Sequence, residues 1–146
     1  MTTLTEAKAA IRARLEANFT AIALRWPNEG ETIPDEPAPF AFTEVIAEDA
    51  FYAGFGGGRG ASLQRAPGRI ECHILAARGT GTEDGEGWAE DICALFRSYR
   101  DGTISCFAAE VFPPLEGPPF TGGAAGSGNY KHVATAVIDF HFDRTG

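Results

Sequence analysis

The sequence predicts an α+β fold: a mostly antiparallel sheet of four to five strands, with two helices packed on one face and long Gly/Pro-rich loops. Three observations predict it. Two stretches place apolar residues at helical spacing, several others alternate apolar and polar residues as strands do, and most consecutive strands are joined by loops. The 146 residues, 44% apolar and 22% charged, are typical of one globular domain, here 1–146.

The first helix is predicted over Thr5–Phe19. Thr3 and Glu6 match the capping box, in which a Thr and a Glu three residues later satisfy each other's backbone N–H groups. Behind them, apolar residues recur in four-residue steps and form a narrow stripe that suits a helix lying on a sheet: Ala7, Ile11, Leu15 and Phe19. A short strand over Ala21–Trp26 follows and is stopped by Pro27.

Two loops flank the next predicted strand. Glu29–Pro39 contains Pro34, Pro37 and Pro39, and proline lacks an N–H and restricts its predecessor, so an extended loop is expected. Phe40–Ala50 alternates and is predicted to be a strand. Phe51–Gly68 is predicted to be a mobile loop, because its glycine density costs too much backbone entropy for a regular element.

A strand, a glycine-rich turn and a helix over Arg69–Tyr99 form the predicted centre of the fold. The strand Arg69–Ala77 has one clearly apolar face, made by Ile70, Cys72, Ile74 and Ala76. The helix begins at Glu83 and Asp84, whose negative charges the helix dipole favours. Its predicted core stripe is Trp88, Ile92, Leu95 and Phe96. Arg100–Gly102 is expected to end it.

Two more strands complete the sheet, with the long loop Pro113–Asn129 between them. Thr103–Phe112 is expected to place Ile104, Cys106 and Ala108 on one face. In the last strand, Tyr130–Asp143, alternation groups His132 with Ala134 and the apolar residues after it, and puts Val133 on the opposite face.

No catalytic, cofactor-binding or metal site is predicted, and the protein is expected not to be an enzyme. Gly54–Gly60 is no phosphate loop, because no Gly-Lys-Ser/Thr follows and it leads into a strand. Cys72 and His73 are adjacent in a strand and point to opposite faces, which argues against a shared metal. With Cys93 and Cys106, Cys72 is expected to be a free, buried and inert thiol.

Composition also limits the partners. The net charge of −8 argues against non-specific binding along nucleic acid, which requires clustered Lys and Arg. No apolar run approaches the roughly 18–20 residues of a membrane span, and the N-terminus lacks the charge and apolar regions of a secretory signal. No membrane association is therefore expected.

The charges are nevertheless unevenly distributed. Phe51–Arg69 contains basic residues and no acid, whereas Glu83–Asp91 contains acids and no base. Plain solvation is one interpretation. The other is that a basic segment of one copy contacts an acidic segment of the next, and such a head-to-tail contact builds a ring when its rotation closes. The residues predicted for this contact are Arg59, Arg65, Arg69, Glu83, Asp84 and Glu86.

This order of elements resembles the phage tail terminator proteins, the small tail-terminator-like minor tail proteins of long-tailed phages. The resemblance lies in the first helix followed at once by Ile22–Asn28, in Gly68–Leu75, in the turn Gly79–Thr82 with its helix, and in the closing strand Val133–Phe142. The glycine loop Gly54–Gly60 and the Gly/Pro-rich segment Pro113–Gly128 depart from the family pattern.

The resemblance implies a structural virion protein without catalysis or cofactor. It implies a homo-oligomeric ring, a hexamer, on the head-proximal end of the tail tube. The ring stops polymerisation of the tail tube protein and offers a surface to the head–tail connector, while DNA passes through its lumen without specific binding. The expected location is the virion, after synthesis in the bacterial cytoplasm. The alternatives are another neck or connector subunit and, from a different class, a small ligand-binding or hydrolytic α+β domain.

Overall fold

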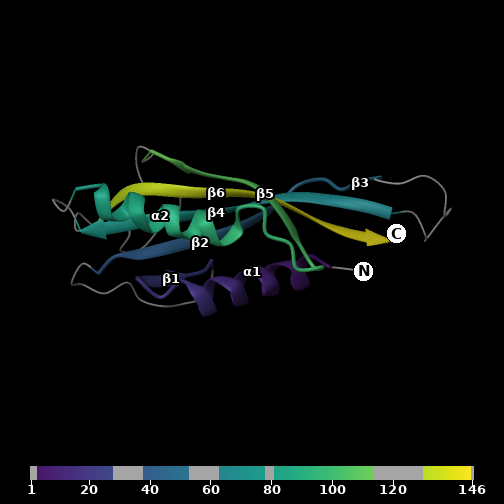
Figure 1. Cartoon of the computed structure of the whole chain (residues 1–146), viewed down its shortest axis with the longest axis horizontal. Helices are drawn as coiled ribbons and strands as arrows, with labels where there is room; N and C mark the ends of the chain where they lie inside the picture. The colour runs from purple at the N-terminus through teal and green to yellow at the C-terminus, as the bar shows by residue number, and fades with distance from the viewer. Residues whose placement is uncertain (1–2, 28–37, 53–62, 78–80, 114–129, 146) are drawn as a thin grey trace.

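The computed structural model describes residues 3–27, 38–52, 63–77, 81–113 and 130–145, and these form two layers: an open sheet and a pair of helices (Figure 1). The elements in chain order are α1 (Leu4–Asn18), β1 (Ala23–Arg25), β2 (Phe40–Ala47), β3 (Phe51–Tyr52), β4 (Leu63–Ala77), α2 (Glu83–Phe96), β5 (Ser105–Phe112) and β6 (Tyr130–Thr145). The strand order is β1-β2-β4-β6-β5, and the short β3 also pairs with β4. Every pairing is antiparallel except β1 with β2, so the predicted α+β class is confirmed.

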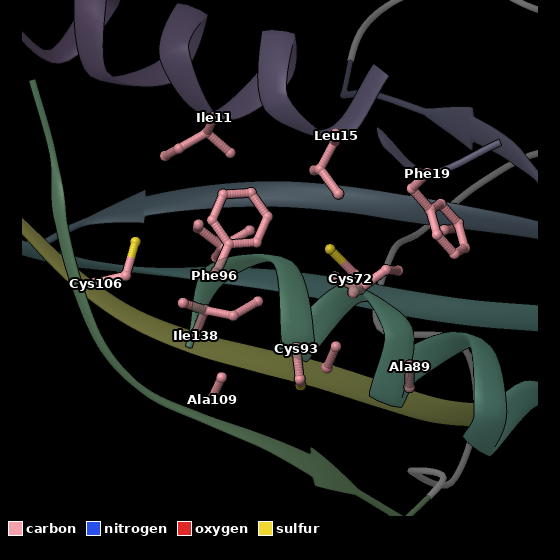
Figure 2. Close-up of a cluster of buried hydrophobic side chains, with 14 of the residues drawn as sticks. Ile11, Leu15, Phe19, Cys72, Ala89, Cys93, Phe96, Cys106, Ala109 and Ile138 are labelled. Atoms are coloured by element: carbon pink, nitrogen blue, oxygen red, sulfur yellow. The ribbon is translucent and has the colours of Figure 1, made fainter. Parts of the chain in front are cut away.

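Helix α1 follows the sequence prediction closely. Its capping box is formed in both directions: Thr3 Oγ1 accepts from the Glu6 N–H at 3.2 Å, and a Glu6 carboxylate oxygen accepts from the Thr3 N–H at 3.1 Å. The predicted stripe of Ala7, Ile11, Leu15 and Phe19 is buried. Figure 2 shows Ile11 and Leu15 of α1, and Phe19 just after it, pointing toward the sheet and α2.

Both helices cover the same face of the sheet, as predicted. Their buried side chains join one hydrophobic cluster with the apolar face of β4 and β6. In Figure 2, Phe96 of α2 lies near Ile11 of α1, and Cys72 and Ile138 come from the strands below. The opposite face of the sheet carries no helix in the described part of the chain. None of the described helices is long and apolar enough to cross a membrane.

Helix α2 is rotated relative to the prediction. Ile92 and Phe96 are buried as expected, but Trp88 and Leu95 only flank the core. The buried stripe consists of Gly85, Ala89, Ile92, Cys93 and Phe96. Its first two members are small, which lets the start of the helix lie close to β6. A Cβ built on Gly85 would overlap Cγ2 of Val133. Close approach therefore decides which face of α2 packs inward.

Two β-bulges correct the predicted faces of the last strands. The β4–β6 register shifts at Ile74/Leu75, so that Ala134 pairs with Ile74 but His132 pairs with Leu75. Val133 consequently faces α2, and His132 turns to the helix-free face, the reverse of simple alternation. A second shift in β5, between Cys106 and Ala109, buries Ala109 in place of the predicted Ala108.

Several predicted boundaries also change. Leu63–Gly68, expected in a loop, forms the first part of β4, and Phe51–Tyr52 forms β3. Helix α2 ends at Phe96, and a tight hairpin follows, in which an Asp101 carboxylate oxygen accepts from the N–H groups of Thr103 and Ile104 at 2.8 Å. The rest of the predicted loops, at residues 29–37, 53–62 and 114–129, lies outside the described residues.

Candidate functional site

A groove of about 560 Å³ lies at one end of the helix-free face, beside the C-terminal end of β6 in Figure 1. Pairing across four neighbouring strands assembles it: Phe51 lies opposite Arg65, Arg65 opposite Asp143, and Ser105 opposite His141. We call it the aromatic groove, and its lining residues are Phe51, Arg65, Pro67, Arg100, Ser105, Phe107, His141 and Asp143.

One ion pair organises the floor of this groove. Arg65 donates two parallel hydrogen bonds to Asp143, from Nε to Oδ1 at 2.8 Å and from Nη2 to Oδ2 at 3.0 Å. These bonds raise the pKa of Arg65 and lower the pKa of Asp143. Burial and the Arg65 charge lower the pKa of His141, so its ring is neutral at pH 7. Arg100 has no ion-pair partner among the described residues and gives the groove a net positive charge.

We expect Asp143→Asn to reduce stability at neutral pH and to lose this effect in acid. The folded-state pKa of Asp143 is lowered. Its contribution to the free energy of unfolding is therefore fully present above the unfolded-state pKa of about 3.9 and disappears as pH falls through the folded-state pKa. Urea unfolding of both proteins across this range measures the difference. Asp139→Asn, on the same strand, is the control, since Asp139 is exposed and forms no ion pair within the described residues. A difference that persists below both pKa values would contradict the explanation.

Two exposed aromatic side chains border the groove. Phe51 is 52% exposed and Phe107 is 43% exposed, and the Phe107 ring lies 4.7 Å from the His141 ring between centroids. Large aromatic residues left in water beside an unpaired cation are typical of contact surfaces. The sequence pattern does not point to Phe51, Phe107 or Arg100, because strand register alone brings them together.

An acidic surface lies at the opposite end of the sheet. Glu83, Asp84 and Glu86 are exposed on the first turn of α2, which begins where β4 ends (Figure 1). None of the three has an ion-pair partner among the described residues, and no side chain caps this helix end. We call these three residues the acidic turn. Arg65 and Ala77, at the two ends of β4, are roughly 40 Å apart at about 3.3 Å per residue.

The structure places the predicted basic residues differently from the sequence expectation. Arg65 and Arg69 lie in β4 and not in a loop, because the strand begins at Leu63. Both form ion pairs within their own chain: Arg65 pairs with Asp143, and Arg69 pairs with Glu48 and Glu71. Arg59 lies outside the described residues. The acidic turn is exposed, whereas Arg65 and Arg69 already pair with acids of their own chain, so Arg100 is the better basic partner for the acidic turn of another copy.

A polar cluster occupies the middle of the helix-free face. His73 is 2% exposed; its Nδ1 lies 3.2 Å from Thr135 Oγ1, and its Nε2 lies 3.4 Å from a Glu44 carboxylate oxygen. Thr135 Oγ1 also lies 2.7 Å from His132 Nε2. Glu71 completes a group with Glu44 and His73 whose ligand atoms all lie within 4.8 Å of one another. This group is the one set of three metal-ligating side chains found among the described residues.

The order carboxylate, imidazole, hydroxyl in Glu44, His73 and Thr135 resembles a hydrolytic triad, but its surroundings do not suit one. Thr135 is only 4% exposed. Neither the aromatic groove nor a second cavity of about 600 Å³ between α1 and β2 is lined by His73 or Thr135. A nucleophile needs space for a reacting atom beside it. The cluster is therefore better suited to holding an ion than to attacking a substrate.

The three cysteines are free and buried, as expected. Cys72 and Cys106 have pKa values raised to about 12 and Cys93 one raised to about 11, in each case mainly by burial. Since the thiolate is the reactive form, these thiols are inert in the folded protein. Cys72 points toward the helices and His73 away from them, as adjacent strand residues do.

We expect no thiol to react with iodoacetamide at pH 8 in the folded protein, and all three to react after unfolding in urea. Mass spectrometry counts the modified sites under each condition. Rapid labelling of any cysteine without denaturant would show that burial does not protect it as the structure indicates.

Comparison with known proteins establishes the fold alone. No protein-family model matches the chain, and no curated protein is similar to it. A solved structure whose name carries no functional description aligns with 92% of this chain and 94% of its own chain, at a TM-score of 0.52 and 17% sequence identity. The arrangement of two helices on this sheet thus occurs in another protein of similar length.

Proposed function

We propose that this protein is a structural subunit of a phage tail that assembles head to tail into a ring and caps the head-proximal end of the tail tube. The observation that carries the proposal is the placement of two unlike surfaces at opposite ends of one rigid sheet. The aromatic groove is positively charged by Arg100, and the acidic turn is negative. Because they lie at opposite ends of the sheet, they cannot meet within one chain and are suited to meet between copies.

The outer edge of β5 is poorly suited to pairing with a strand of another copy, which favours an end-to-end contact between copies. Strand edges are where sheets extend, but carbonyls on this edge are already bonded within the chain. The Ser98 N–H donates to the Phe107 carbonyl at 3.3 Å, and Arg97 Nη2 donates to the Ala109 carbonyl at 2.7 Å. A neighbouring strand would have to displace both. Association through the two end surfaces requires no such exchange.

Two observations support the tail-terminator role for this ring. The order of elements resembles that family, and the α+β class that the resemblance implied is the class observed. A ring of six subunits, each with a net charge of −8, would let DNA pass through without the clustered cations that non-specific binding requires.

Electron microscopy and native mass spectrometry of the purified protein test ring formation. We expect rings with a central hole and a mass that is a whole multiple of the subunit. Addition to polymerising tail tube protein should then give tubes closed at one end and arrested in length. Rings that bind the head portal but leave tube growth unchanged would indicate another neck subunit. A monomer at all concentrations and salt conditions would exclude the ring.

A further inference from the structure

We propose that Glu44, Glu71 and His73 on the helix-free face bind a divalent transition-metal ion, Zn²⁺ above all. The site joins β2 to β4 in the middle of the sheet, away from both the aromatic groove and the acidic turn. It does not rest on ring assembly, and its test is independent of the test for that function.

Strand register brings the three ligands together. Glu44 lies directly opposite Glu71 in the β2–β4 pair, and His73 follows Glu71 by two residues on the same face. Their ligand atoms all lie within 4.8 Å of one another. Two ligands of a tetrahedral zinc ion lie about 3.4 Å apart for bond lengths of about 2.1 Å, so small rotations of the two glutamates suffice. Those side chains are 30% and 22% exposed and have room to rotate.

The hydrogen bonds behind His73 suit it to bind a metal through Nε2. His132 Nε2 lies 3.0 Å from the Ala134 carbonyl, which only accepts, so this nitrogen carries a proton and also donates to Thr135 Oγ1. The Thr135 oxygen has a second lone pair for the His73 Nδ1–H, 3.2 Å away. Nε2 is then unprotonated and faces the carboxylates. A metal-binding histidine ordinarily has its other ring nitrogen held in this way.

The two opposed carboxylates favour a cation between them. Like charges placed directly opposite each other on neighbouring strands destabilise the pairing, and both glutamates are partly withdrawn from water. Arg69 Nε lies 3.5 Å from one Glu71 oxygen, which leaves the other oxygen for an ion. One imidazole and two carboxylates favour Zn²⁺, Co²⁺ or Mn²⁺ over Mg²⁺ and Ca²⁺, which prefer all-oxygen sites. Three protein ligands leave a position for water.

Isothermal titration of the untagged, chelator-treated full chain with ZnCl₂ at pH 7.5 tests the site. We expect one ion per chain and at least tenfold weaker binding in Glu44→Gln and in Glu71→Gln, which keep the side-chain shape. Glu110→Gln, an exposed glutamate of β5, is the matched control and should bind as the wild type does. MgCl₂ should give no comparable heat. Wild-type-like zinc affinity in both glutamine variants would place the ion elsewhere and overturn the proposal.

Spectroscopy separates ligation from a loss of folding. Co²⁺ bound by one histidine and two carboxylates should show visible absorption that is abolished in Glu44→Gln, whose circular dichroism should match the wild type. Thr135→Val removes the hydroxyl behind His73 and should weaken metal binding by about 10–100-fold while leaving one ion per chain. A wild-type protein that binds none of Zn²⁺, Co²⁺ and Mn²⁺ would overturn the proposal.

Discussion

Replacing Gly85 by alanine should destabilise the protein, whereas the same change at Gly87, two residues along the same helix, should stabilise it. A Cβ at position 85 would overlap Cγ2 of Val133 and lie 3.0 Å from its Cβ, and nothing lies within 4 Å of a Cβ at position 87. Valine in a strand has a stiff side chain and cannot easily turn away. Overpacking of this kind costs about 1–3 kcal/mol, against roughly 0.5–1 kcal/mol gained when alanine replaces a helical glycine.

Thermal unfolding measures both changes, with an expected shift in Tm of roughly 2–4 °C for each kcal/mol. Gly85→Ala should lower Tm and Gly87→Ala should raise it. Val133→Ala provides a second control, because it removes the methyl groups that a new Cβ would meet. In Gly85→Ala/Val133→Ala the two effects should therefore be far from additive. Additive losses, or a Gly85→Ala protein as stable as Gly87→Ala, would show that α2 does not lie this close to β6.

The two helices show which structural features the spacing of apolar residues can predict and which it cannot. For α1 the capping residues and the apolar stripe lie within one stretch of chain, so its bounds and its buried face could be predicted together. The existence of α2 could be predicted in the same way. Its orientation could not, because the contact that decides it joins Gly85 to Val133, and Val133 faces inward only after a bulge in β6.

The candidate sites depend still more on distant pairing. Arg65 has its partner Asp143 at a separation of 78 residues, and the glycines before Arg65 concealed the start of β4. The prediction that Cys72 and His73 point to opposite faces is confirmed. The group of Glu44, Glu71 and His73 could not be predicted, because it depends on Glu44 lying opposite Glu71 in the β2–β4 pair. The acidic turn could be predicted from the sequence, because the helix dipole favours acidic residues in the first turn of a helix.

Charge reversal at either end surface should prevent ring assembly at moderate salt. In Arg100→Glu the groove would present a negative charge to the acidic turn of the next copy, and in Glu83→Lys/Glu86→Lys the turn would present positive charges to Arg100. Like charges brought together at an interface oppose association, and each tenfold loss of affinity corresponds to about 1.4 kcal/mol. Because both surfaces are exposed, the effect should weaken as salt rises. Lys8→Glu, an exposed change on α1, is the control.

Mixing the two defective proteins tests the direction of the contact. Each would keep one intact end, so a native groove can receive a native turn at one junction, and the two reversed charges attract each other at the next. An equimolar mixture should therefore form rings in which the variants alternate, visible by native mass spectrometry as equal numbers of each. Arg100→Glu/Glu83→Lys/Glu86→Lys in one chain should assemble alone for the same reason. Rings formed by either variant by itself would contradict the head-to-tail contact, because every junction would then join like charges.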